Sequence, residues 1–323
     1  MFLENNLLVI NENNMTITYD IRIEAVYCLL ILSGYNIISP YSEKYQMKIF
    51  RAFHGVLKND YVKHFSKICF DKFRYVIPCS FALSTEYDNG KINQKSVMKE
   101  EYIKQLGGND EIEKCIESIN GFISESNFSN FFYENQDEYF KYLQKHKSLL
   151  FSVMNDVQKW YGKEAMTYTA YLSQLVHPGG FGVGIDSPAC VLGSILNPDH
   201  TVNEPLSVNV CFHEFSHYFI DKFIFDNWQN IHRKVGHLSN DISPDDYLNI
   251  LCQQELFGES IIRAIANYYC YKQSKSVNTR DFIDYPYSHT LYEILKKENI
   301  VYINSEVLNM LLSEVINLIG TVK

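Results

Sequence analysis

The sequence predicts an α+β protein that is mainly helical, and two changes in its hydrophobic pattern lead to this class. Apolar residues recur at helical spacing in segments 21–33, 41–57, 59–73, 95–106, 110–122 and 135–161. From residue 166 the chain instead has β-prone segments, 166–172 and 189–196, before helical spacing returns. We therefore expect a mainly helical N-terminal region, residues 1–165, and a mixed α/β region, residues 166–323, in which a small sheet packs beside a long helix.

Composition limits the partners that this chain is expected to have. The 323 residues carry a net charge of −9, so a broad positive surface for nucleic acid is not expected. The longest early apolar run, residues 25–33, is too short to span a membrane, and no basic stretch of a signal peptide precedes it. None of the eight cysteines lies close enough to another to form a CxxC pair. We expect a cytoplasmic protein with buried thiols, no membrane partner and no nucleic-acid partner.

The strongest chemical motif is HEFSH at residues 213–217, inside a helix expected over 206–225 and capped by Asn203. His213 and His217 are four residues apart, so they lie on one helix face and can hold one Zn²⁺ ion. Glu214 lies about 100° round the helix from His213, beside the metal and not on it. From there Glu214 can act as the general base toward a water molecule.

A catalytic zinc site normally needs a third protein ligand. The continuation HExxHxxGxxH is absent, because Ile220 and Phe223 occupy the positions it requires. After loop-like sequence from 230 to 243, a helix is expected to run from Pro244 to about residue 271, and it contains two glutamates four residues apart. Either Glu255 or Glu259 can bind the zinc while the other accepts a hydrogen bond from a ligand histidine and orients it.

These residues resemble the gluzincin group of zinc metallopeptidases. The chain is most similar to a poorly characterised bacterial family of HEFSH-containing metallopeptidases, and the resemblance spans most of its length. HEFSH and the Glu-x-x-x-Arg-Ala segment at 259–264 are the specific motifs. Weaker similarity is found in segments 20–24, 32–35, 179–182, 285–287 and 291–295.

The resemblance implies a zincin-like catalytic half with zinc as cofactor and a peptide or protein as substrate. Within the HEFSH family the third ligand maps to Glu259, whereas the pattern of thermolysin-like enzymes would select Glu255 and give Glu259 a supporting role. We favour Glu259, so that His213, His217 and Glu259 hold Zn²⁺ and Glu214 activates water. Two alternatives stay open: a non-catalytic zinc-binding protein of zincin fold, and a zinc hydrolase of a non-peptide amide.

Peptide hydrolysis at zinc also needs a donor for the negative charge that develops on the carbonyl oxygen. The segment DYPYSH supplies Tyr287 and His289 as candidates, after the expected ligand helix. His232 and His237 are expected in the loop between the two metal-bearing helices, where solvent exposure is their default role. Arg263, one turn beyond Glu259, is expected to pair with that glutamate and fix its conformation.

The glycine-rich segment 179–184 lacks the Gly-Lys-Ser/Thr ending of a phosphate loop, and we interpret it as a tight turn. One of the strands 166–172 and 189–196 is expected to pair with an extended substrate, because a peptide can add to the edge of a sheet.

Overall fold

The computed structural model describes residues 3–4, 7–184, 186–193, 195–197, 201–235 and 247–321, and confirms a mainly helical α+β protein. The chain forms two compact units. Unit 1 comprises Met1–Ser148, Thr169–Val183 and Cys190–Val202. Unit 2 comprises Leu149–Tyr168, Gly184–Ala189 and Asn203–Lys323.

This division differs from a single boundary at residue 165. Most of the sheet-forming sequence after residue 165 belongs to unit 1, because its strands pair with strands from the N-terminus. Residues 149–168, which include the end of a long helix, belong instead to unit 2 with the HEFSH helix. The packing of the sheet beside that helix therefore stays a prediction.

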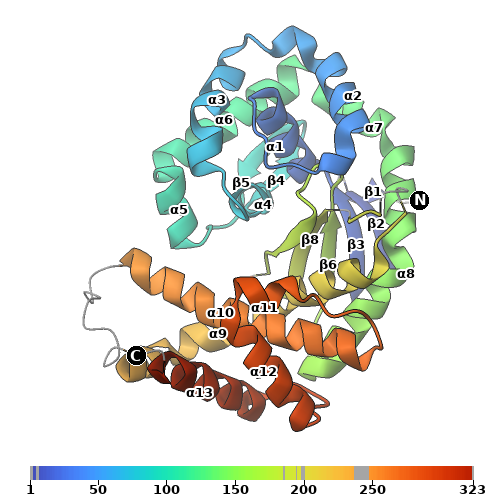
Figure 1. The fold of residues 1–323 in the computed structure, drawn as a ribbon. Helices are drawn as coiled ribbons and strands as arrows, with labels where there is room; N and C mark the ends of the chain where they lie inside the picture. The colour runs from blue at the N-terminus through green and yellow to red at the C-terminus, as the bar shows by residue number, and fades with distance from the viewer. Residues whose placement is uncertain are drawn as a thin grey trace. The chain divides into compact units, whose positions relative to one another are not determined.

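Unit 1 contains a six-stranded sheet of order β1-β2-β3-β6-β8-β7 (Figure 1). The strands are β1 Leu3–Glu4, β2 Leu7–Glu12, β3 Met15–Asp20, β6 Tyr168–Leu172, β7 Gly179–Gly182 and β8 Ala189–Gly193. β2 and β3 form an antiparallel hairpin with Ile10 opposite Ile17, and β7 pairs with β8 with Phe181 opposite Val191.

The sheet corrects two expectations about the segment before HEFSH. Residues 179–182, which we interpreted as a tight turn, form β7 at the end of the strand order. The strands that we expected to offer an edge to substrate, β6 and β8, each have a neighbour on both sides. The hypothesis that one of them adds a substrate strand is therefore wrong, since their backbone groups already pair within the sheet.

The sequence prediction also missed both hairpins of the N-terminal region, β2–β3 and a separate two-stranded sheet of β4 Thr85–Asp88 and β5 Lys91–Gln94. Asn89 and Gly90 connect β4 to β5 with φ of 48° and 78°. Positive φ at both positions is what a tight two-residue hairpin turn requires, and Asn-Gly is its strongest local signal.

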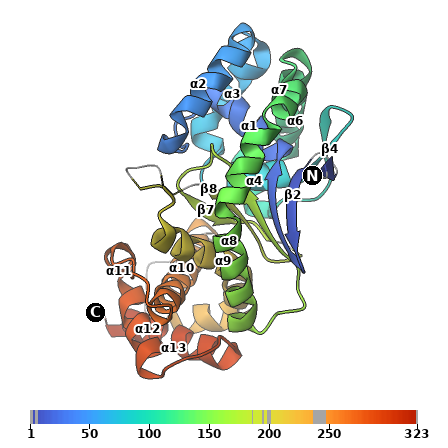
Figure 2. The same ribbon diagram turned by 90° about the vertical axis from the view of Figure 1, so that its right-hand side faces the viewer.

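Helix α1, Ile21–Leu32, is the central element of unit 1 and contacts α2, α3, α4 and α6 (Figure 2). A helix that is apolar on all sides is typical of a position inside the core. The helices around it are α2 Glu43–Phe53, α3 Asp60–Lys72, α4 Ile77–Leu83, α5 Glu100–Leu106, α6 Asn109–Glu125, α7 Phe128–Glu134 and the first part of α8 Gln136–Tyr161. Asp20 caps α1 by accepting a hydrogen bond from the Arg22 backbone N–H at 2.8 Å.

One charged residue, Glu24, lies inside this core with no solvent exposure. Its Oε2 atom accepts a hydrogen bond from the Ser173 hydroxyl at 3.3 Å, while its Oε1 atom has no hydrogen-bond partner among the described residues. Burial raises the pKa of Glu24 to about 7, although the nearby hydroxyls of Tyr45 and Tyr19 partly oppose this shift. Glu24 therefore holds a proton more tightly in the folded protein than in the unfolded chain.

We expect this carboxyl group to make the protein less stable as the pH rises. Its pKa increases from 4.5 to about 7 on folding, so the penalty grows between these values and reaches about 3 kcal/mol above pH 7. Glu24→Gln should remove that dependence and stabilise the protein at pH 8, as measured by urea unfolding at pH 5, 6.5 and 8. Glu113→Gln, at an exposed position of α6, is the matched control. Equal slopes of stability against pH in the Glu24 variant and the unmodified protein would contradict the assignment.

Unit 2 is built from helices, with α9 Glu204–Val235 and α10 Tyr247–Lys272 packed against each other. The shorter helices are α11 Arg280–Asp284, α12 Pro286–Lys297 and α13 Ser305–Thr321. Aromatic rings join the end of α8 to this pair: Phe212 stacks on Tyr269 at 4.1 Å, and Trp160 meets Phe212 edge-on at 5.5 Å. Buried aromatic pairs of this kind contribute both area and fixed geometry, so they hold α9 and α10 in register.

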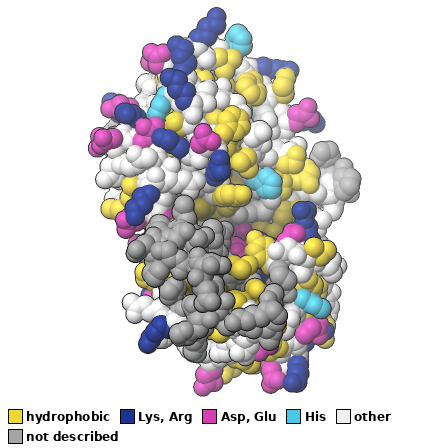
Figure 3. Space-filling model, turned by 60° about the vertical axis from the view of Figure 1, so that its left-hand side comes forward, with side chains coloured by type: hydrophobic (Ala, Val, Ile, Leu, Met, Phe, Trp, Pro, Cys, Tyr) yellow, Lys and Arg dark blue, Asp and Glu magenta, His cyan; other side chains and the backbone are white. Residues whose placement is uncertain are grey.

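Helix α9 is longer than expected, because residues 230–235, which we placed in a loop, continue it. On the face drawn in Figure 3, Lys and Arg side chains are interspersed with Asp and Glu over the described part of the surface. Among the described residues, no helix combines the length and the apolar character needed to cross a membrane.

Candidate metal site

The HEFSH residues are presented by α9, whose two faces have different composition. Asn203 caps its start, with its side-chain oxygen accepting from the Leu206 N–H at 3.2 Å. Phe212 and Phe215 are fully buried on one side of the helix. The sequence places polar residues at intervals of four along another stripe: Asn209, His213, His217 and Asp221. This spacing stacks their side chains on one face, one turn apart.

Helix α10 supplies the third member of the site. Glu259 lies on α10. This helix is fixed against α9 by the stacking of Tyr269, from α10, on Phe212, the residue that precedes His213 on α9. Gly258 lies opposite Asp221, such that an added methyl group would come to 3.5 Å from the Asp221 carboxylate. The two helices thus approach closely where the stripe of α9 meets Glu259.

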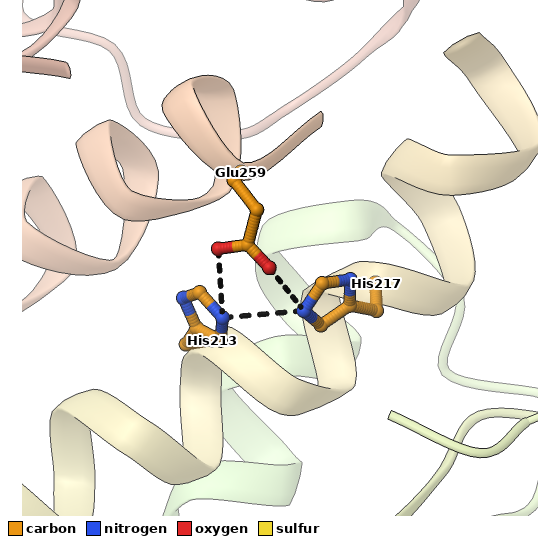
Figure 4. A group of neighbouring side chains, drawn as sticks. All are labelled: His213, His217 and Glu259. Atoms are coloured by element: carbon orange, nitrogen blue, oxygen red, sulfur yellow. Dashed lines mark hydrogen bonds and ion pairs between the residues drawn. The ribbon is translucent and has the colours of Figure 1, made fainter. Parts of the chain in front are cut away.

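His213, His217 and Glu259 converge, as Figure 4 shows, with one possible ligand atom from each lying within 4.8 Å of the others. The two Nε2 atoms are 3.2 Å apart. Glu259 Oε2 lies 3.6 Å from His213 Nε2, and Oε1 lies 3.5 Å from His217 Nε2. These three residues are the set that the sequence analysis favoured as metal ligands.

The cluster fits a tetrahedral zinc ion in both size and chemistry. With zinc–ligand bonds of about 2.0–2.1 Å, neighbouring ligand atoms of a tetrahedron are separated by about 3.3 Å, close to the 3.2 Å between the two Nε2 atoms. Each Nε2 atom also lies 3.5–3.6 Å from one of the two oxygens of Glu259. Two imidazoles and one carboxylate are a common donor set for catalytic zinc. Glu259 Oε2 is buried and has no hydrogen-bond partner within the described protein, which leaves its lone pairs available to a metal.

Glu214 lies beside this cluster. Its Oε1 is 3.9 Å from His213 Nε2 and its Oε2 is 3.8 Å from His217 Nε2, so it is farther from both ring nitrogens than Glu259 is. Glu214 is buried with only 8 % of its surface exposed. A carboxylate in this place is suited to taking a proton from a water molecule at the centre of the cluster.

The two histidines differ in protonation when no metal is bound. Burial, together with the charges of His217 and Arg263, lowers the pKa of His213 well below its ordinary value, so this ring is neutral at pH 7. Burial also lowers the pKa of His217, but the carboxylates of Asp221, Glu259 and Glu214 outweigh it and raise the value to about 10. A metal ion bound by both Nε2 atoms would therefore displace a proton from His217.

Further residues hold the three ligands in position. Asp221 Oδ1 accepts from His217 Nδ1 at 3.2 Å, which directs Nε2 of that ring into the cluster. Arg263 Nε lies 3.0 Å from Glu259 Oε2, so the expected pairing of these two residues is observed. The Arg263 guanidinium also donates a hydrogen bond from Nη1 to Asp281 Oδ1 at 2.6 Å, and it stacks over the Tyr285 ring at 4.1 Å.

The roles of Tyr287 and His289 as transition-state donors stay predictions. Both lie on α12, where His289 is exposed, faces Glu293 at 4.0 Å and packs against Phe282. Tyr285, from the same segment, contacts the ligand network, because its ring stacks on Arg263.

Three other expected positions lie outside what the structure describes, wholly or in part. His232 falls within α9 and not in a loop, but its side chain is outside the described residues. His237 lies outside the described residues altogether. Glu255 is one turn before Glu259 in α10, and its side chain is likewise not described. The choice between Glu255 and Glu259 therefore depends on the geometry of Glu259 alone.

Sequence reasoning missed two residues that contact the site, Asp221 and Asp281. Asp221 continues the four-residue spacing of His213 and His217, so extending that stripe by one turn would have identified it. Asp281 gives no comparable signal, because it lies on a different helix, α11, and reaches Arg263 only through the fold.

Comparison of the chain with models of known protein families, with curated proteins and with solved structures gives no match. The assignment of this site therefore depends on its motif and on its geometry.

Proposed function

We propose that the protein is a zinc-dependent metallopeptidase, in which His213, His217 and Glu259 hold the metal and Glu214 is the general base. The observation that supports this most strongly is the convergence of the three side chains: the two Nε2 atoms are 3.2 Å apart, and each lies 3.5 or 3.6 Å from one of the two carboxylate oxygens of Glu259. Residues from two different helices meet at the spacing of a tetrahedral site, beside a carboxylate that is not needed as a ligand.

The bound zinc would lower the pKa of a water molecule and polarise the carbonyl group of a substrate. Glu214 would accept a proton as that water adds to the carbonyl carbon, and would then deliver the proton to the leaving amine. Asp221 would keep His217 in the tautomer that presents Nε2. His213, neutral because it is buried, would bind without first losing a proton.

The zincin-like fold and the cytoplasmic location belong to the same proposal. HEFSH on one helix and the ligand glutamate on the next helix support the fold, through the resemblance to gluzincins. All seven cysteines with described side chains are buried and free, which supports a reducing compartment. A peptide or protein is the proposed substrate class.

Removal of the metal should abolish hydrolysis reversibly. We expect a chelator such as 1,10-phenanthroline to eliminate cleavage of a mixed peptide library, detected by mass spectrometry, because the site would lose the group that activates water. Stoichiometric Zn²⁺ added to the dialysed protein should restore it. A non-chelating phenanthroline isomer is the control.

The same experiment separates the alternatives. Zinc binding with no cleavage of peptides but turnover of small amides would favour a non-peptide hydrolase. Zinc binding with no turnover of either substrate class would favour a non-catalytic zinc protein. Cleavage that continues unchanged in the chelator would refute the zinc-dependent mechanism.

A further inference from the structure

A series of ion pairs and hydrogen bonds connects the ligand Glu259 on α10, through residues of α10 and α11, with Asn209 on α9. Arg263 contacts Glu259 on one side and Asp281 on the other. The second carboxylate oxygen of Asp281 accepts from Asn267 Nδ2 at 3.0 Å. Asn267 Oδ1 in turn accepts from Asn209 Nδ2 at 3.3 Å and from the Asn278 backbone N–H at 2.7 Å. Asn209 lies one turn before His213, so this series connects one metal ligand with the helix that presents the other two.

The two contacts of Arg263 are not equivalent. Toward Asp281 the guanidinium makes a hydrogen bond of 2.6 Å, and the Asp281 side chain is 5 % exposed. Toward Glu259 the separation between Nε and Oε2 is 3.0 Å, yet among the described residues neither of these two atoms has a hydrogen-bond partner. The cation is therefore held by Asp281, and its contact with Glu259 is an ion pair that leaves the carboxylate lone pairs free.

This asymmetry matters because an arginine beside a ligand carboxylate competes with the metal. A guanidinium that turned fully onto Glu259 would form a two-pronged, charge-assisted pair, one of the strongest contacts available to a carboxylate. A metal would then have to break that pair to bind. An arginine held and neutralised by a second carboxylate instead fixes the position of Glu259 without using its lone pairs.

We propose that Asp281 is a positioning residue of the metal site, which holds Arg263 so that Glu259 stays available to the metal. The inference depends on the proposed zinc site and adds a residue that acts through Arg263, without contact with the metal. Asn267 completes the arrangement by donating to the Asp281 oxygen that Arg263 does not use, and Asn209 in turn donates to Asn267.

The test is the zinc affinity of Asp281→Asn, measured by competition with a chromophoric chelator. We expect affinity to fall by about 10–100-fold, the usual effect of losing a partner that orients a metal ligand. The Co²⁺-loaded variant should also show an altered visible absorption spectrum, because the ligand field changes when Glu259 turns toward Arg263. Asp284→Asn, on the same helix in an exposed ion pair with Arg280, is the matched control and should bind zinc normally.

A double variant separates positioning from folding. In Arg263→Gln/Asp281→Asn the competing cation is absent, so zinc affinity should rise above that of Asp281→Asn, while the lost contact between Arg263 and Glu259 keeps it below that of the unmodified protein. Unchanged affinity in Asp281→Asn, or a double variant as weak as the single one, would overturn the inference. Failure of the unmodified protein to bind zinc would instead refute the proposed function on which the inference rests.

Discussion

Replacement of Glu214 by Gln is expected to leave zinc bound and to reduce peptide hydrolysis by about 10²–10⁴-fold, the usual contribution of a general base. The amide has the shape of the carboxylate but cannot accept the proton of the attacking water. Glu214 lies 3.8–3.9 Å from the two ring nitrogens, farther than Glu259, so its charge is not needed as a ligand. The measurement is the zinc content of the variant together with its turnover of a peptide found to be cleaved.

The control for this variant is Glu293→Gln, which makes the same chemical change on the exposed surface of α12 in unit 2. It should retain both zinc and activity. Near-normal turnover in Glu214→Gln would show that another group takes the proton, and loss of zinc would show that Glu214 is itself a ligand.

The second large effect is expected at the third ligand. Glu259→Ala should lose zinc at concentrations where the unmodified protein is saturated, because one of three protein ligands is removed. The affinity should fall by more than the roughly 10–100-fold typical of residues that only support a ligand. Metal content after dialysis against a weak chelator measures this directly.

Glu255→Ala is the matched control, since it makes the same change one helical turn earlier in α10. Zinc should be retained in that variant. The opposite pattern, with zinc lost on changing Glu255 and kept on changing Glu259, would assign the thermolysin-like arrangement and contradict the role given to Glu259.

The helices of this protein were largely predictable because their apolar residues recur with a clear period. The segment 21–33 was predicted as an apolar helix and forms α1 over Ile21–Leu32, and 59–73 forms α3 over Asp60–Lys72. The ends of helices were less predictable: residues 230–235 were expected in a loop, but they continue α9 to Val235. Packing against other helices, which the sequence does not display, sustains such extensions.

The strands were harder to predict because they are short and depend on partners far away in the chain. Residues 179–182 contain three glycines, and their extended form is supported by pairing with β8 and not by local preference. The N-terminal β2–β3 hairpin was not predicted, although both strands contain β-branched and apolar residues. Each strand is only six residues long, and long helical segments follow directly. The β4–β5 turn at Asn89-Gly90 carried a sequence signal that was overlooked.

The residues of the site also differ in whether the sequence predicts them. The two histidines and Glu214 follow from the spacing within one helix, and the pairing of Arg263 with Glu259 follows from spacing within another. Asp281 could not be inferred, since its contact with Arg263 joins α11 to α10 through the tertiary fold. Glu24 could have been noticed as the one acidic residue of α1, whose other residues are uncharged apart from Arg22 in its first turn.

Metal content of the freshly purified protein, measured by plasma mass spectrometry, tests the central claim most directly. A zinc site formed by His213, His217 and Glu259 predicts one zinc ion per chain, or its uptake from micromolar zinc with release of a proton from His217. A protein that contains no metal and takes up none under these conditions would show that HEFSH is a helix with two neighbouring histidines, and the proposed enzyme activity would be refuted with it.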